Sequence, residues 1–342
     1  MTGATTRPTK PAPAEPVVAY DINIPYHDGS VEDAGRMKHP QYKPTWNPIW
    51  FDPVPPFEFV DPATRADPEK PNLSAAGAPQ LQHLSPKMGT ILTGVDLAAL
   101  IDNDAAKDEL ALLICERKIV VFPDQQAFIA AGPAAQQKFM DYFGKRNYQP
   151  VSGSVPDVSY ERQPPGYVML GLLDGPSCGG DTVFAATDEA FKRLSPAMQT
   201  FLSTLRVTHS SQNMLNHTRL AGGLVRKDAV TSVHPLVRVH PITGAHCLFI
   251  NGEFITGAVG LKDAEWKALS DFLLRHIIES HDVQVRVHWA PNSVVLFDNR
   301  STLQADTAVT DYVDDENGAQ PRHIFRLAAM AETPIPVCPS NA

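Results

Sequence analysis

The chain has 342 residues, enough for one large domain with extensions or for two modest ones. Hydrophobic residues make up 43% and charged residues 20%, which is ordinary globular usage and excludes a collagen-like or wholly disordered chain. The formal net charge of −9 argues against a nucleic-acid-binding surface, because such a surface needs clustered positive charge. We therefore expect a globular protein with small-molecule or protein partners.

The location of the protein is predicted from what its sequence lacks. The first residues contain no apolar signal region, and no apolar run is long enough to span a bilayer. The cysteines are widely spaced and form no CxxC pair for zinc or redox chemistry: Cys115, Cys178, Cys247 and Cys338. We expect reduced thiols, a cytoplasmic location, and neither a membrane nor a nucleic-acid partner. A homo-oligomer is compatible with this composition.

Proline is concentrated near the N-terminus. About half of the 31 prolines precede residue 90, where they interrupt helices and sheets. We predict a disordered tail over residues 1–18 and a Pro-rich extended arm over 19–86. The aromatic residues of segment 46–59 favour an arm that packs on the core. A free Pro-rich ligand for another protein is the alternative that composition leaves open.

Periodic patterns begin near residue 87. Residues 105–118 have helical spacing, and residues 118–125 contain a short buried strand. Further helices are predicted within 188–205 and 262–279. Further strands are predicted within 166–174, 181–186, 205–210, 234–241, 246–254, 283–291, 293–299 and 322–330. Roughly eight to ten short strands between turn signals favour a sandwich or barrel. The predicted domain covers 87–331, and 332–342 is a C-terminal tail.

Two arginines near the C-terminus suggest an anion site. Arg322 and Arg326 are four residues apart in a predicted strand, so their side chains point to the same face. A guanidinium binds a carboxylate or sulfonate through a planar fork of donors. The pair therefore predicts an anionic ligand, and the ordinary alternative is a pair of exposed or Asp-bonded arginines.

Several segments follow one another in a familiar order: GTILTGVDLAAL, RKIVVFPDQ, DYFGKRNYQPVSG, DVSYERQPPG, CGGDTVF, HPLVRVHPITGAHCLFING, VLFDNRSTLQ and RHIFR. This order resembles the taurine dioxygenase family, particularly its fungal sulfonate-dioxygenase-like branch, over residues 87–331. The resemblance implies a mainly β fold with flanking helices, the double-stranded β-helix or cupin-like jelly roll. It also implies hydroxylation of a small organic anion, with Fe(II) and 2-oxoglutarate as cofactors.

The resemblance assigns pocket residues by position: Thr182 and Arg322 to 2-oxoglutarate, Val158, Phe254 and Arg326 to substrate, and Asp157 to iron. The family holds iron with two histidines and one carboxylate on one face. Val155 and Gln304 stand at the two histidine positions, and Gln149 stands where a substrate-binding histidine is expected. The segment before Asp157 is also shorter than in the family. We therefore expect impaired iron binding and impaired activity.

Three functions stay open at this point: an impaired oxygenase of the family, a non-catalytic relative that binds an anionic metabolite or a partner through the arginine pair, and a metal-independent isomerase or lyase of secondary metabolism. His209 and His323 are the first candidates for replacement ligands, because both lie on strands expected near the pocket mouth. The short segment before Asp157 fits a natural deletion or an exon-boundary error. Such an error does not explain Gln304, which lies in an intact segment.

Overall fold

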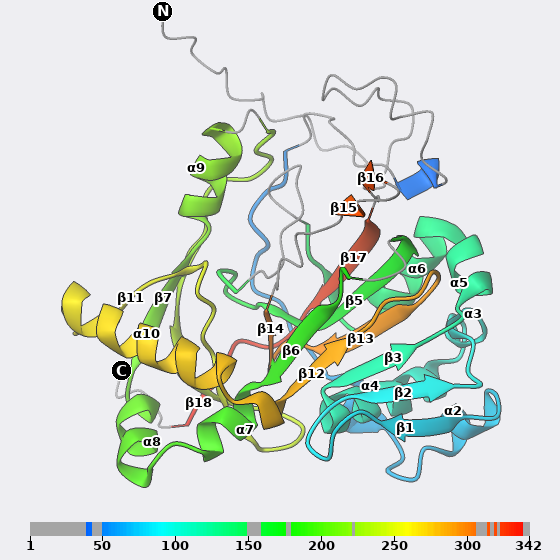
Figure 1. Cartoon of the computed structure of the whole chain (residues 1–342), viewed down its shortest axis with the longest axis horizontal. Coiled ribbons are helices and arrows are strands. Elements are labelled where there is room, and N and C mark those ends of the chain that lie inside the picture. The colour runs from blue at the N-terminus through cyan, green and yellow to red at the C-terminus, as the bar shows by residue number, and fades with distance from the viewer. Residues whose placement is uncertain are drawn as a thin grey trace, which may run out of the picture.

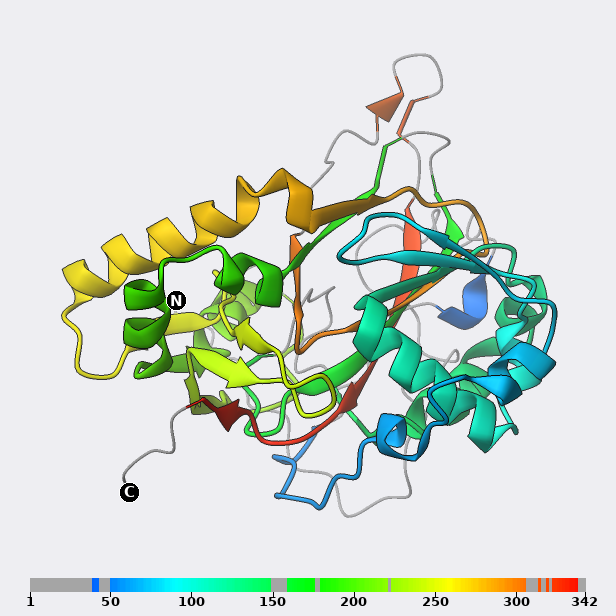
Figure 2. The same ribbon diagram turned by 90° about the horizontal axis from the view of Figure 1, so that it is seen from below.

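A computed structural model describes residues 39–42, 50–148, 159–175, 179–220, 223–305, 313–314, 318–319 and 322–337. Several predictions fall outside these residues: the 1–18 tail, Gln149, Val155, Asp157, Val158, Cys178 and Cys338. Within the described residues, strands form two layers and helices cover their outer faces (Figures 1 and 2). The predicted mainly β class with flanking helices is confirmed.

The larger layer is a seven-stranded sheet among the described residues. Its order is β1 (Gln80–His83), β2 (Thr90–Thr93), β3 (Ile119–Phe122), β13 (Val294–Asp298), β5 (Pro165–Asp174), β17 (His323–Met330) and β4 (Lys145–Arg146). Neighbouring strands are antiparallel except for the parallel pair of β2 and β3. At the centre of the sheet, Leu170 of β5 lies opposite Val295 on one side and Arg326 on the other.

The second layer consists of small antiparallel sheets. In the first sheet the strand order is β12 (Gln284–Val287), β6 (Thr182–Ala186) and β14 (Thr302–Ala305). In the second it is β11 (Ile255–Ala258), β7 (Arg206–Ser210) and β8 (Thr231–Pro235). In the third it is β10 (His246–Leu248), β9 (Val237–Val239) and β18 (Ile335–Pro336). A hairpin of β15 (Val313–Asp314) and β16 (Gly318–Ala319) is separate. Phe184 and Val285 of the first small sheet pack with Val168 and Leu170 of the large sheet. These two layers enclose the apolar interior expected of a jelly roll.

Helices cover both layers from outside (Figure 2). Those on the large sheet are α3 (Leu97–Leu100), α4 (Asp104–Arg117), α5 (Gln126–Ala130) and α6 (Gly132–Asp141), and those around the second layer are α7 (Thr187–Lys192), α8 (Pro196–Ser203), α9 (Gln212–Leu220) and α10 (Asp263–Ile278). Short pieces are η1 (Pro40–Tyr42), η2 (Pro62–Arg65), α2 (Pro71–Ala75) and η3 (His281–Val283). Leu110, Phe139 and Phe325 share the core between the helices and the large sheet. None of the helices described is both long and apolar enough to cross a membrane.

Some predicted elements differ from those observed. The helical segment 188–205 forms two helices, because Pro196 cannot continue α7 and Ser195 caps the new helix by accepting from Met198 N–H at 3.4 Å. Of the predicted strand 246–254, only β10 forms. The predicted strand 234–241 covers β9 and only the end of β8. The patterns missed β1, whose residues are all exposed, so that it lacks the apolar alternation that marks a half-buried strand. They also missed the short strand β11.

The described part of the N-terminal segment contacts the main domain. Phe57 N–H donates to Gln163 Oε1, and Gln163 Nε2 donates to Phe57 O, both at 3.0 Å. Glu109 of α4 accepts from Leu73 N–H of α2 at 2.6 Å. Two strands pair across the predicted domain boundaries: β1, within the predicted arm 19–86, pairs with β2, and β18, within the predicted tail 332–342, pairs with β9. The domain boundaries stay predictions.

Candidate functional site

Strand alternation directs both arginines into the space between the layers. On β17, Phe325 packs toward the helices, whereas Ile324 and Ala328 pack between the layers. Arg326 shares the parity of Ile324 and Ala328, so it faces the same inner space. Arg322 Nη2 donates to a hydroxyl of β6 at 3.3 Å, which places this guanidinium there too. The two arginines therefore share the face that their spacing predicts.

Thr182 of β6 lies at the centre of the candidate anion site. Its side chain is buried, and its Oγ1 accepts from Trp289 Nε1 at 2.9 Å and from Arg322 Nη2 at 3.3 Å. With both acceptor positions used, the hydroxyl hydrogen is left to donate to a ligand. Arg322 Nε is buried and has no hydrogen-bond partner among the described residues. A carboxylate here would meet a hydroxyl donor and a guanidinium donor.

Trp289 was not singled out in the sequence. It lies two residues after the end of β12, and the strand pattern predicts only that its side chain continues the alternation of Val285 and Val287. Its hydrogen bond to Thr182 joins residues 107 positions apart, so no local signal could reveal it.

Gln304 also faces the inner space. It lies opposite Phe184 in the pairing of β14 with β6, whereas the preceding Leu303 packs into the core around α10. Its side chain therefore shares a face with Thr182. The Gln304 amide is neutral, and it is a weaker ligand for a first-row divalent metal than an imidazole.

Phe254 lies apart from this group. It is fully buried in a separate cluster with Met214 and Leu215, and its ring meets that of Tyr160 at a centroid distance of 5.2 Å. The described contacts therefore do not bring this predicted substrate residue together with Thr182 and Arg322.

The two histidines proposed as replacement ligands lie elsewhere. His209 is on β7, outside the sheet of Thr182 and Gln304, with Nδ1 2.8 Å from Ser159 Oγ. Burial lowers its pKa to about 3. The His323 ring lies 6.3 Å from that of Tyr42, on the helical side of β17. Neither histidine shares the inner face with Gln304.

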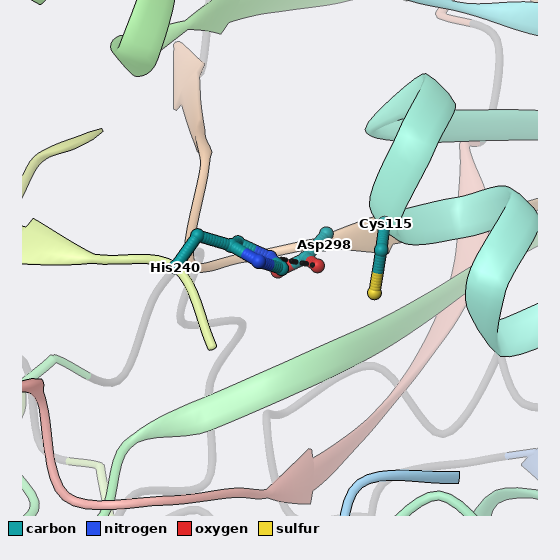
Figure 3. A group of neighbouring side chains, drawn as sticks. All are labelled: Cys115, His240 and Asp298. Carbon is teal, nitrogen blue, oxygen red and sulfur yellow. Dashed lines mark hydrogen bonds and ion pairs between the residues drawn. The ribbon is translucent and has the colours of Figure 1, made fainter. Parts of the chain in front are cut away.

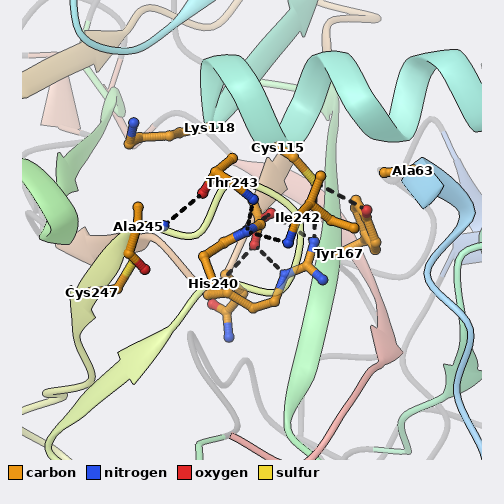
Figure 4. Close-up of polar contacts among 12 residues, drawn as sticks. Ala63, Cys115, Lys118, Tyr167, His240, Ile242, Thr243, Ala245 and Cys247 are labelled. Atoms are coloured by element: carbon orange, nitrogen blue, oxygen red, sulfur yellow. Dashed lines mark hydrogen bonds and ion pairs between the residues drawn. The ribbon is translucent and has the colours of Figure 1, made fainter. Parts of the chain in front are cut away.

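Three potential metal ligands meet in another part of the core (Figure 3). Ligand atoms of Cys115, His240 and Asp298 lie within 4.8 Å of one another, the one such group among the described residues. His240 Nε2 donates to Asp298 Oδ2 at 2.8 Å. His240 Nδ1 accepts the backbone N–H groups of Ile242 and Thr243, each at 3.2 Å (Figure 4). Hydrogen bonds therefore occupy both ring nitrogens of His240.

Arg300 supplies the positive charge that a metal would bring to this cluster. Its Nε and Nη2 donate to the two carboxylate oxygens of Asp298 at 2.8 Å each, and Nη2 lies 3.3 Å from Cys115 Sγ. Burial opposes ionisation of Asp298, but the charge of Arg300 holds the pKa of this carboxyl well below its usual range. Burial raises the pKa of the Cys115 thiol well above its usual value. A protonated thiol and an occupied imidazole make this a structural ion network and not a metal site.

Comparison with known proteins identifies the family. Residues 153–328 match the model of the taurine catabolism dioxygenase TauD, TfdA family. An alpha-ketoglutarate-dependent sulfonate dioxygenase of Saccharomyces cerevisiae is 38% identical, over 88% of this chain and 79% of that protein. The chain belongs to the TauD/TfdA family.

Other proteins similar to this chain support the family assignment. The alpha-ketoglutarate-dependent dioxygenase cnsM of Penicillium expansum is 33% identical, over 90% of this chain and 93% of that protein. A crystal structure of a taurine dioxygenase from Burkholderia xenovorans superposes with a TM-score of 0.60, at 24% identity, over 76% of this chain and 92% of that one. The structural likeness confirms the fold, and the sequence relatives confirm the predicted fungal branch.

The residues that the resemblance assigns to iron in this TauD/TfdA chain do not make up the two histidines and one carboxylate of a facial triad. A facial triad needs two imidazoles and a carboxylate on one face. Gln304 brings a neutral amide to the inner face, and in the sequence Val155 offers no donor atom. Among the described residues, the Cys115 cluster is closed by Arg300. Of the assigned ligand positions, Asp157 alone keeps a ligand type that the family uses.

Proposed function

We propose that this TauD/TfdA chain binds a 2-oxoglutarate-like dicarboxylate without iron and has lost normal iron-dependent hydroxylation. The observation that carries the proposal is the contact of Arg322 with Thr182, which offers two donors to an anion, beside an amide where the family has an imidazole. Arg326, on the same inner face, would bind the anionic group of a second small ligand.

Binding in this pocket depends on charge and geometry supplied by the protein alone. The Thr182 hydroxyl would donate to one carboxylate oxygen, and the Arg322 guanidinium would neutralise the carboxylate. The surrounding apolar residues, including Phe184 and Leu170, lower the local dielectric and so strengthen these charged hydrogen bonds. We also propose a cytoplasmic location, which the free and buried thiols of Cys115 and Cys247 support.

Thermal unfolding with 2-oxoglutarate, in chelator-treated buffer and with added Fe(II), tests the proposal. A ligand that binds only the folded state raises the melting temperature by mass action. We expect 2-oxoglutarate to raise it equally with and without metal, and Arg322→Met to abolish the rise. Iron binding near one equivalent, together with substrate-dependent consumption of 2-oxoglutarate, would show that the chain is a working oxygenase.

A further inference from the structure

An unpartnered amide lies buried at the edge of the large sheet. Asn147 is 9% exposed, and neither its Oδ1 nor its Nδ2 makes a hydrogen bond in the described structure. Its backbone N–H donates to Ala328 O at 3.0 Å, which extends the pairing of β4 with β17 by one residue. Leaving a buried polar group unsatisfied costs roughly 1–3 kcal/mol, so this amide is a candidate to bind a polar group of a ligand.

Strand alternation directs this amide toward the space between the two layers. Arg146, one residue earlier, points to the helical face, where its Nη1 donates to Gln137 Oε1 at 2.8 Å. Asn147 therefore points to the opposite face, where Ala328 packs between the layers. Diagonal neighbours on paired strands are about 7–8 Å apart, within reach of long side chains, and Arg326 is the diagonal neighbour of Asn147. Ala328, opposite Asn147, carries only a methyl group.

We propose that Asn147 and Arg326 together recognise an organic anion that carries a hydroxyl or carboxamide group next to its acid group. The guanidinium takes the acid group. The Asn147 amide offers one acceptor and two donors, which a hydroxyl or a carboxamide satisfies and an alkyl chain leaves unsatisfied. The inference rests on the proposed function, since it uses the same pocket, and it narrows the class of the second small ligand to polar anions.

The variant Asn147→Leu tests this role, because leucine has nearly the same shape without polar atoms. We expect its melting temperature to rise, since an unsatisfied buried amide is removed. The probes are 2-hydroxyethanesulfonate and ethanesulfonate, which differ by one hydroxyl group. We expect titration calorimetry to show that the native chain prefers the hydroxylated anion by about tenfold, the effect of one hydrogen bond, and that the variant loses this preference.

Gln137→Met is the matched control. Gln137 is also a buried amide, and its Nε2 has no hydrogen-bond partner among the described residues, but it lies on the helical face and its Oε1 accepts from Arg146. This variant should lower the melting temperature and keep the preference for the hydroxylated anion. A higher melting temperature for Asn147→Leu and a lower one for Gln137→Met would distinguish an amide that binds a ligand from an amide that stabilises the fold.

Each remaining outcome has a definite meaning. A lower melting temperature for Asn147→Leu with an unchanged preference would make Asn147 structural and overturn the inference. Equal affinity of the native chain for both sulfonates would also overturn it, while the dicarboxylate site of the proposed function could still stand. If neither sulfonate nor 2-oxoglutarate binds the native chain, the proposed function and the inference both fail.

Discussion

At the scale of single residues, Trp289 sets the orientation of the Thr182 hydroxyl in the candidate anion site. Its Nε1 donates to Thr182 Oγ1 at 2.9 Å, and both side chains are buried. Trp289→Phe keeps an aromatic ring and removes the donor. We expect 2-oxoglutarate to bind about three- to tenfold more weakly, because the hydroxyl loses a bond that directs its hydrogen to the ligand. Calorimetric titration measures the change.

Trp266→Phe provides the comparison for this variant. Trp266 is a buried tryptophan of α10, in a different core cluster from Trp289. Its replacement should leave the affinity for 2-oxoglutarate unchanged. Equal affinity losses in both variants would mean that the effect of Trp289→Phe is a general loss of packing.

A second residue-scale prediction concerns Arg300. This buried guanidinium pairs with Asp298 and with Asp61, so Arg300→Met leaves two buried carboxylates without their cation. We expect the free energy of unfolding to fall by roughly 3–5 kcal/mol, measured by urea denaturation. Lys267→Met removes the exposed pair with Asp271 and should change it by less than about 1 kcal/mol. A small effect for Arg300→Met would contradict a structural role for the network.

The sequence was enough to predict the anion-binding arginines of the candidate site, but not the residues that hydrogen-bond around them. Arg322 and Arg326 could be predicted because their spacing alone gives them a common face. Trp289 and Asn147 could not be predicted, because a single Trp or Asn gives no periodic signal. Their place in the site depends on contacts with residues on strands distant in the sequence.

At the scale of elements, β5 and β17 pack closely at a glycine. A Cβ added to Gly171 would lie 2.2 Å from a ring carbon of Phe325, its partner on β17. Gly171→Ala must therefore displace a buried aromatic ring, and we expect it to lower the free energy of unfolding by about 1–3 kcal/mol. Gly257→Ala on β11 meets nothing within 4 Å and should change it by less than about 0.5 kcal/mol. Similar effects of both substitutions in denaturation would contradict the close packing.

Strands were predicted correctly from the sequence where their residues are buried. The strand β13, with residues buried throughout, gave the apolar run that was predicted as a strand. The edge strand β1, exposed along its length, was missed because its polar side chains face water and its place in the sheet depends on pairing with β2. The apolar periodicity of a segment indicates which of its residues are buried. The pairing of an exposed edge strand depends on the neighbouring strand, and so it cannot be read from the local sequence.

At the scale of the whole molecule, buried histidines make stability depend on pH. Burial lowers the pKa of His209 to about 3 and that of His234 to about 4. The unfolded chain binds protons at these histidines below about pH 6.5, whereas the folded chain excludes them. We therefore expect the free energy of unfolding to fall between pH 6.5 and 4, by about 2 kcal/mol per histidine at pH 5. Urea denaturation at pH 7 and 5 measures the loss.

Substitution separates this effect from general acid denaturation. His209→Asn should make the loss between pH 7 and 5 smaller, because one proton-linked group is gone. The exposed His217 should be replaceable by glutamine with no change in that loss. If His209→Asn leaves the loss as large as in the native chain, His209 is not a source of the pH dependence.

The sequence by itself determined the β-rich class and the TauD/TfdA membership, because these depend on residue identity and order, whereas the substitution of imidazoles by Val155 and Gln304 stays a prediction. The tertiary structure decided that Gln304 faces the space between the layers and that His209 lies in another sheet. It also decided that Arg300, paired with Asp61 across 239 positions, closes the Cys115 cluster to a metal. Contacts of such separation arise only when the layers pack, because packing alone brings distant side chains within hydrogen-bonding distance.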